Sequence, residues 1–141
     1  MRENGFNESA TSILFNHYYK KKNSDPCSKD ISLSTISYLN KNFDFTLPEI
    51  DTVHESSDKT VKFLFKLKDG KKVESVLIPF HNKYSLCLSS QVGCAMKCSF
   101  CFTGTQGLKR NLETSEIIGQ FLAAWHWLKL NRPGEEKILN I

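Results

Sequence analysis

The sequence lacks the features of membrane-spanning, secreted and low-complexity proteins. It has no apolar run approaching the ~20 residues that a membrane span needs. The opening stretch, MRENGFNESATSILFNHYYKKK, contains neither a long apolar segment nor a small-residue cleavage site, so we expect no signal peptide and a cytoplasmic location. Internal repeats and low-complexity tracts are also absent. A chain of 141 residues with this character is expected to form one globular domain, or one domain with a small appendage.

An excess of charge of one sign is also missing. The 19 basic and 15 acidic residues give a net charge of +4. This balance permits an RNA partner without requiring one, because it is also common in proteins that bind no nucleic acid. The lysine run at residues 20–22 follows two tyrosines and could contact RNA, although a solvated helix end is the more ordinary interpretation.

Cysteines are few and unevenly spread. Cys94, Cys98 and Cys101 form a C-x3-C-x2-C cluster, whereas Cys27 stands alone in a polar stretch and is assigned no role. Thiols stay reduced in the cytoplasm, and the odd total of five cysteines argues against a disulfide framework. The cluster therefore indicates metal binding or thiol chemistry.

The cluster has no obvious fourth ligand. Structural zinc sites usually combine two separated ligand pairs, and the sequence offers no second pair, although His126 could in principle complete such a site. Soft thiolates also suit iron–sulfur clusters, and a four-iron cubane is normally held by four cysteines. Three protein thiolates would leave one iron free to bind another molecule.

Hydrophobic patterning divides the part of the chain that precedes the cysteine cluster into two segments. Residues 1–50 are expected to form a helical N-terminal region, because apolar residues recur at helical spacing across residues 32–45. Residues 51–83 are expected to form a β-hairpin, because two segments of alternating polarity flank an Asp-Gly turn at Asp69.

Residues 84–141 are expected to form a βαβ unit. The segment YSLCLSS alternates like a strand, and after the cysteines Thr114 can cap a helix with a wide apolar stripe. The stripe comprises Ile117, Ile118, Phe121, Leu122, Trp125 and Leu128. KILNI then begins another strand, so the fold class is α/β, with a parallel sheet or barrel in this part.

The residues around the cysteines resemble those of a known enzyme superfamily. CAMKCSFC, with Phe100 as the aromatic residue, is similar to the C-x3-C-x-aromatic-C loop of the radical S-adenosylmethionine (SAM) enzymes. The flanking motifs SSQVGC, TGTQG, RNL and EIIGQ, and the hairpin LKDGKKVESVLIP, resemble one family among them. That family is the dual-specificity adenine-C2 methyltransferases of 23S rRNA and tRNA, whose sisters are C8 rRNA methyltransferases. The resemblance extends from about Leu33 to Ile141.

This resemblance implies a barrel and two cofactors. The family's cysteine loop follows the first strand of a partial (β/α)6 radical SAM barrel, so residues 84–141 would form the first βα unit. Cys94, Cys98 and Cys101 would be the metal ligands of a [4Fe-4S] cluster. The cluster's free iron would bind S-adenosyl-L-methionine.

Two further residues receive catalytic roles from the resemblance. Glu74 matches the family's glutamate in V-E-x-V, the base that removes the ring proton, although by pattern alone it would be a solvated hairpin residue. Cys87 matches a second catalytic cysteine, which helps to resolve a protein–RNA crosslink by disulfide formation. The alternative for Cys87 is a buried strand cysteine. The family's methyl-carrying cysteine near the C-terminus has no counterpart among the five cysteines here.

The resemblance further implies an enzyme, a radical SAM rRNA and tRNA adenine-C2 methyltransferase. Its substrates would be 23S rRNA and tRNA, its reducing electron donor a protein such as flavodoxin, and its oligomeric state monomeric. From Tyr84 onward the chain has room for one βα unit and the start of a second strand. We therefore expect an N-terminal fragment with a shortened RNA-binding-like region and a truncated barrel, inactive alone. Two alternatives stay open: a non-catalytic fragment that binds iron–sulfur, another metal or RNA, and a different radical SAM enzyme.

The polar residues after the cysteines allow two interpretations. Gln106, Lys109 and Arg110 could hold the loop or contact RNA phosphate, and a solvated position is equally compatible with the pattern. Gly104 and Gly107 are expected to permit tight backbone turns.

Overall fold

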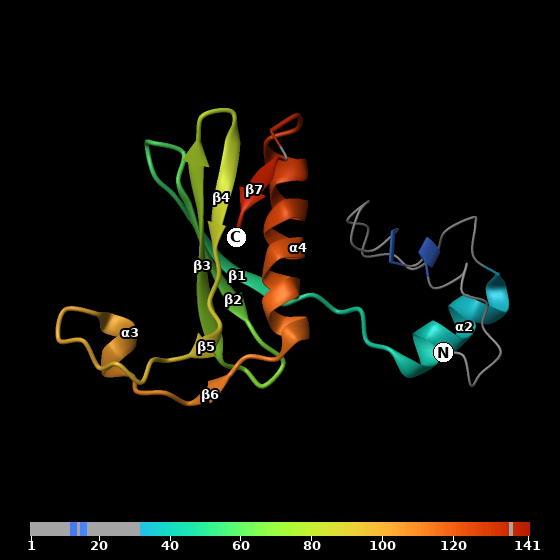
Figure 1. Ribbon diagram of the computed structural model, residues 1–141, viewed down its shortest axis with the longest axis horizontal. Coiled ribbons are helices and arrows are strands. Elements are labelled where there is room, and N and C mark those ends of the chain that lie inside the picture. The colour runs from blue at the N-terminus through green and yellow to red at the C-terminus, as the bar shows by residue number, and fades with distance from the viewer. Residues whose placement is uncertain (1–11, 14, 17–31, 136) are drawn as a thin grey trace. The chain divides into compact units, whose positions relative to one another are not determined.

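The structure is a computed structural model that describes residues 12–13, 15–16, 32–135 and 137–141 (Figure 1). The chain divides into two compact units. The first unit spans Met1–Thr46 and the second Leu47–Ile141. The lysine run at residues 20–22 and Cys27 lie outside the described residues.

Helix α2 spans Leu33–Asn42 in the first unit. It confirms the helix that the sequence predicted in this region. Its N-cap is Ser32, whose side chain accepts a hydrogen bond from the amide of Thr35 at 3.3 Å. The backbone turns to an extended conformation at Phe43, so the helix ends earlier than the predicted residue 45. The apolar spacing that predicted α2 does not mark one buried stripe, because Leu39 is 2% exposed but Leu33 is 84% exposed.

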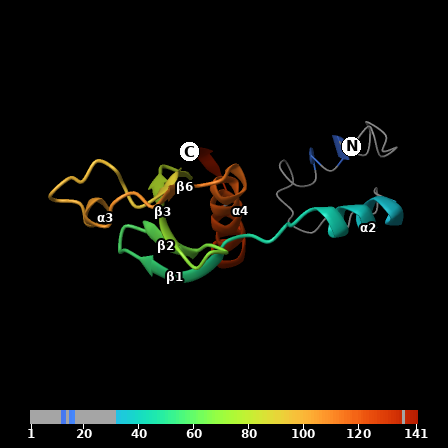
Figure 2. The same cartoon turned by 90° about the horizontal axis from the view of Figure 1, so that it is seen from below.

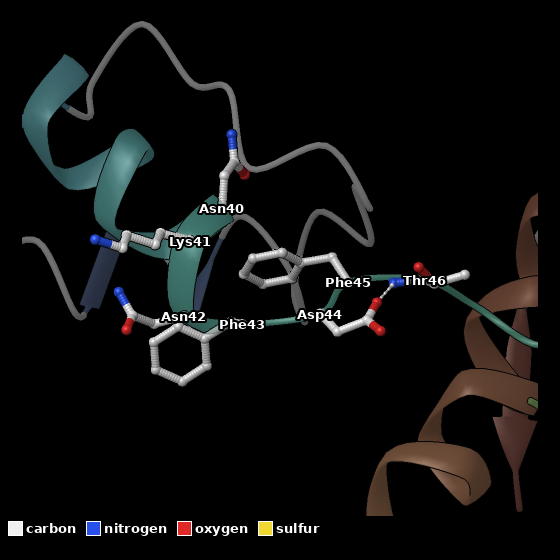
Figure 3. Close-up of a pocket in the computed structure, with 7 residues that line it drawn as sticks. All are labelled: Asn40, Lys41, Asn42, Phe43, Asp44, Phe45 and Thr46. Carbon is white, nitrogen blue, oxygen red and sulfur yellow. Dashed lines mark hydrogen bonds between the residues drawn. The ribbon is translucent and has the colours of Figure 1, made fainter.

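A shallow hollow lies at the end of α2, and Figure 3 shows the residues that line it. Its lining comprises Asn40, Lys41, Asn42, Phe43, Asp44, Phe45 and Thr46. The carboxylate of Asp44 accepts a hydrogen bond from the amide of Thr46 at 2.8 Å, and the rings of Phe43 and Phe45 lie 6.4 Å apart. None of the predicted site residues lines this hollow, and we assign it no role.

The second unit is built on a five-stranded sheet in the order β1-β2-β3-β4-β7 (Figure 1). The strands are β1 Glu49–Glu55, β2 Val61–Lys66, β3 Lys72–Phe80, β4 Lys83–Cys87 and β7 Ile138–Asn140. Strands β1 to β4 pair antiparallel, and β7 pairs parallel to β4. The predicted hairpin around the Asp-Gly turn is confirmed as β2 and β3, and the predicted parallel pairing is confirmed as β4 and β7. Strand β1 was not predicted from the sequence.

Helix α4, Thr114–Asn131, covers one face of this sheet, as Figures 1 and 2 both show. The core between them contains the fully buried Phe63, Phe65 and Leu77 of the sheet and Leu128 of the helix. Trp127 adds an edge-to-face contact with Phe63, with ring centroids 5.3 Å apart. Burial of these large apolar side chains is the main force that holds helix and sheet together.

The start of α4 differs by one residue from the prediction. Its N-cap is Glu113, not Thr114. Glu113 and Glu116 form a capping box, in which each side chain accepts a hydrogen bond from the backbone amide of the other residue. A carboxylate in this position also suits the positive end of the helix dipole.

The buried face of α4 is less apolar than the predicted stripe. Ala123, Ala124 and Gln120 lie on it, although the prediction included none of them. Small residues at this face let the helix backbone approach the sheet closely. Across the helices that the structure describes, none has the length and apolar character required to cross a membrane.

Candidate functional site

The predicted ligand cysteines lie on a loop that is closed at its base by a short neck. Strands β5 (Gln91–Val92) and β6 (Arg110–Asn111) pair antiparallel on the two sides of residues 93–107, which we call the cysteine loop. Two backbone hydrogen bonds of 2.9 Å, from Lys109 to Val92 and from Leu112 to Ser90, close the neck. Figures 1 and 2 show the cysteine loop and its short helix α3 (Phe102–Thr105) projecting from the sheet, away from α4.

Two glycines cross where the neck opens into the cysteine loop. Gly93 has φ +74° and Gly107 has φ +65°, values that side chains with a Cβ rarely adopt. A Cβ on Gly93 would lie 1.9 Å from the carbonyl oxygen of Gly107. The expectation of a tight turn at Gly107 is therefore confirmed, whereas Gly93 was not singled out from the sequence.

Inside the cysteine loop, Cys101 is the N-cap of α3, and Cys98 lies against this helix. The amide of Met96 donates to Sγ of Cys94 at 3.4 Å, and the amide of Cys101 donates to the carbonyl of Cys98 at 3.1 Å. A Cβ on Gly104 would come within 3.0 Å of the Cys98 amide nitrogen, so the glycine allows α3 to lie directly against Cys98.

The donor chemistry of these residues fits an iron–sulfur cluster. Cys94, Cys98 and Cys101 are free, partly exposed thiols on a single loop. Within the described residues, no three His, Cys, Asp or Glu side chains are gathered in an array that could hold a metal ion. The fit therefore rests on three soft donors and their accessibility. His126, considered above as a zinc ligand, lies on α4 with its ring 5.3 Å from the ring of Trp125.

The four described cysteines form no disulfide. Cys87, Cys94, Cys98 and Cys101 are all free in this structure. The disulfide that the resemblance implied for Cys87 is therefore not present among the described residues.

Glu74 and Cys87 lie on the face of the sheet opposite α4. Both side chains are exposed, on strands β3 and β4 respectively. Cys87 pairs directly with Val76, and Glu74 lies two residues from Val76 on the same strand. Glu74 and Cys87 are thus diagonal neighbours on one face, a relationship that typically separates residues by about 7–8 Å. The alternative of a buried strand cysteine is wrong for Cys87, because the thiol is exposed.

Lys62 is a charged neighbour that sequence reasoning did not identify. Its Nζ lies 3.1 Å from Oε1 of Glu74, whose side chain is 50% exposed. Lys62 pairs with Val76 across β2 and β3, so it occupies the same open face as Glu74 and Cys87. The alternation of charged residues along β2 carried a signal for this face, but the partner strand and register came only from the structure.

Gln120 holds the point where β4 leads into the neck. Its side chain is fully buried on α4. Oε1 accepts from Oγ of Ser75 at 2.7 Å and from the amide of Ser89 at 3.2 Å. Nε2 donates to the carbonyl of Ser89 at 3.0 Å and to the carbonyl of Glu116 at 3.2 Å. The side-chain amide therefore binds both backbone groups of Ser89.

Arg110 holds the other side of the neck. Its guanidinium donates to both carboxylate oxygens of Glu116, at 2.7 and 2.8 Å, and to Oδ2 of Asp69 at 2.9 Å. The hydrogen bonds that Arg110 donates lower the pKa of both carboxyls. Because Glu116 and, to a smaller extent, Asp69 accept these hydrogen bonds, they raise the pKa of Arg110. Of the two interpretations of Arg110, the structure favours the one in which it holds the loop. The side chains of Gln106 and Lys109 are exposed.

Comparison with solved structures defines the class of this fold. The chain superposes with a TM-score of 0.78 on a radical SAM methyltransferase from Sphaerobacter thermophilus. The two are 29% identical, and the match covers 92% of this chain and 38% of the other. The α/β unit that carries the cysteine loop is therefore similar to part of a radical SAM methyltransferase. No family model matches the chain.

Comparison with curated proteins then gives the particular relatives. The chain is 48% identical over 102 residues to the dual-specificity RNA methyltransferase RlmN of Paracoccus denitrificans, and the match covers 70% of this chain and 26% of that protein. It is 42% identical over 129 residues to RlmN of Nitratidesulfovibrio vulgaris strain DSM 19637, with 88% of this chain and 35% of that protein covered. A probable RlmN of Akkermansia muciniphila is 52% identical over 94 residues.

The chain is thus similar over most of its length to dual-specificity RNA methyltransferases named RlmN, the family that the sequence motifs resemble. It spans about a quarter to a third of the length of these relatives, with 26% of the first and 35% of the second covered.

Proposed function

We propose that this chain provides the cofactor-binding part of a radical SAM methyltransferase that methylates C2 of adenine in 23S rRNA and tRNA. The observation that carries the proposal is the cysteine loop, with three free thiols above a closed neck, in a chain similar to RlmN proteins. The sheet would be the start of a partial (β/α)6 barrel, in which β4 and β7 are the first two parallel strands and α4 connects them. We expect the chain to act in the cytoplasm and as a monomer.

Cys94, Cys98 and Cys101 would hold a [4Fe-4S] cluster through their thiolates. Because they supply three ligands, one iron would be left for S-adenosyl-L-methionine. When bound, these two groups would supply the radical chemistry that starts methyl transfer, with electrons from a reducing donor such as flavodoxin. The partial exposure of the three thiols keeps the position accessible to both groups.

Glu74 and Cys87 would act on the RNA from the open face of the sheet. Glu74 would serve as the base that takes the ring proton, and its carboxylate, paired with Lys62 at 3.1 Å, is accessible on this face. The exposed Cys87 thiol would act beside it on the adduct between protein and RNA. Their common face supports this assignment, because both groups could then reach one base bound on that face.

Anaerobic reconstitution of the chain with ferrous iron and sulfide tests the cofactor assignment. We expect about four irons per chain and the broad thiolate-to-iron charge-transfer absorbance of a cubane cluster. We also expect S-adenosyl-L-methionine to change the electron paramagnetic resonance spectrum of the reduced cluster. A chain that takes up zinc and shows no such absorbance would contradict the proposal.

The reconstituted chain, tested with S-adenosyl-L-methionine and then with RNA, also separates the enzyme from the two alternative functions. A cluster that forms but never responds to S-adenosyl-L-methionine would favour a non-catalytic iron–sulfur protein over a methyltransferase. A response to S-adenosyl-L-methionine without any binding of adenine-containing 23S rRNA or tRNA fragments would instead favour a radical SAM enzyme with another substrate.

A further inference from the structure

We propose that Gln120 is a positioning residue that sets where the cysteine loop begins relative to the sheet face carrying Glu74 and Cys87. The inference rests on the proposed function, because it concerns how the cluster-binding loop is placed against the two groups that would act on RNA. Gln120 touches none of these groups itself. It acts through the backbone of Ser89.

The first observation is the number of contacts made by one buried side chain. Gln120 is 0% exposed, and its amide makes four hydrogen bonds to three other residues. A buried polar side chain is costly unless its hydrogen bonds are satisfied, and no buried side-chain nitrogen or oxygen lacks a partner in the described part of the chain. An apolar residue would be the simpler choice at this interior position if packing alone mattered.

The second observation is what the amide binds. Gln120 accepts from the Ser89 amide and donates to the Ser89 carbonyl, as a neighbouring strand would. This contact occurs two residues after Cys87, where β4 has ended and the β5 neck has not begun. The glutamine thus continues the pairing of the chain through a gap between two strands. A backbone fixed at both groups cannot shift its register there.

The third observation links this point to the open face. Oγ of Ser89 donates to the backbone carbonyl of Glu74 at 2.7 Å. Gln120 also accepts from Ser75, the residue that follows Glu74 on β3. The Gln120 side chain therefore connects α4 by hydrogen bonds both to β3 beside Glu74 and to the backbone just before the neck. Glu116, one turn earlier on α4, pairs with Arg110 on the other side of the neck.

The central test replaces the amide while keeping its size. Gln120→Met has nearly the same length but can replace none of the four hydrogen bonds. Leu128→Ala is the matched control, because Leu128 is equally buried on α4 but belongs to the apolar core of the sheet. Ser75→Ala is a second control that removes one hydrogen bond to Gln120 and leaves both contacts with Ser89.

Hydrogen exchange of the metal-free chain provides the first readout. We expect Gln120→Met to speed exchange of the Lys109 and Leu112 amides, which close the neck, by about tenfold more than exchange of the β2 amides. Leu128→Ala should speed exchange in the sheet by at least as much as in the neck. Equal acceleration of neck and sheet in Gln120→Met would overturn the inference, since it would show a purely structural role.

Cluster retention provides a readout that stability alone would not move. After reconstitution, we expect Gln120→Met to lose iron to a chelator about tenfold faster than the unaltered chain, in line with the effect of residues that support metal ligands. Ser75→Ala and Leu128→Ala should retain the cluster within about twofold at equal folded fraction. Equal retention of the cluster by Gln120→Met and the unaltered chain would overturn the inference. Absence of any cluster in the unaltered chain would instead overturn the proposed function, and the hydrogen-exchange experiment would then decide the role of Gln120.

Discussion

Gly93 and Gly107 cross so closely at the neck of the cysteine loop that a Cβ on Gly93 would lie 1.9 Å from the carbonyl oxygen of Gly107. The crossing brings the backbones of the two sides of the loop into close approach. We expect Gly93→Ala to open the neck, because the new methyl group meets backbone that cannot move aside. The predicted loss of stability is about 1–3 kcal/mol beyond the cost of the positive φ itself.

Gly107→Ala is the matched control for this first prediction. Gly107 also has a positive φ, but a Cβ there would have no heavy atom within 4 Å. It should therefore cost only the backbone strain, about 1–2 kcal/mol. Urea unfolding of the two variants measures the difference. If both variants lose the same stability, the close approach at Gly93 is not what closes the neck.

The ion pairs of Arg110 predict a dependence of stability on pH. Arg110 lowers the pKa of Asp69 well below its usual value of 3.8 and also lowers the pKa of Glu116. A carboxyl with a lower pKa in the folded state stabilises the protein above its unfolded pKa, and this contribution is lost as the pH falls through the folded pKa. Asp69→Asn should therefore lower the urea midpoint at neutral pH, and its difference from the unaltered chain should shrink below about pH 4.

Unfolding in urea between neutral pH and strong acid checks the direction of this effect. Asp69 and Arg110 are partly exposed, so the difference should also decrease with added salt. A difference between Asp69→Asn and the unaltered chain that stays constant across this pH range would contradict the assignment. So would a difference that grows on acidification.

The cysteines are expected to separate into three ligands and one other thiol. Single substitutions Cys94→Ser, Cys98→Ser and Cys101→Ser should each reduce bound iron to a small fraction of that in the unaltered chain, because a cubane held by two thiolates is poorly retained. Cys87→Ser should keep its iron, since Cys87 lies on β4 and not on the cysteine loop. Iron and sulfide analysis after anaerobic reconstitution measures both effects. Loss of iron from Cys87→Ser would place this thiol among the ligands instead.

The contact between Phe63 and Trp127 predicts where the stability of the second unit resides. Phe63 is fully buried, and its ring meets Trp127 edge-to-face at 5.3 Å. Phe63→Ala should cost about 3–5 kcal/mol, since it leaves a cavity between α4 and the sheet. Phe80→Ala, at a position 59% exposed, should change stability by less than about 0.5 kcal/mol. Thermal unfolding of the two variants should show this contrast, and similar losses would argue against a core centred on Phe63.

Local sequence patterns were sufficient for the elements that have strong periodicity. The hairpin β2–β3 follows from alternating residues around an Asp-Gly turn, and α4 follows from a long apolar repeat. Strand β1 was missed because it is polar and partly exposed, so it carries no clear alternation. The paired strands of the neck were missed because two residues are too short for any period to appear.

The site was predictable to the extent that it is a linear motif. Cys94, Cys98 and Cys101 lie within eight consecutive residues, so their spacing alone predicted three soft donors on one loop. Gln120 gave no such signal, since a glutamine in an apolar helix repeat looks like a residue at the edge of the stripe. Only the fold showed it to be fully buried against Ser75 and Ser89.

The sequence by itself determined the chemistry of the donors, the resemblance to one enzyme family, and the order of strand, loop and helix, because these depend on residues close together in the chain. The tertiary structure decided that Glu74 and Cys87 share the open face, since this depends on the register between β3 and β4. It also decided how the cysteine loop is held, through contacts that join residues 31 and 45 positions apart. Such contacts exist only once α4 has packed on the sheet, and no local pattern in the chain encodes them.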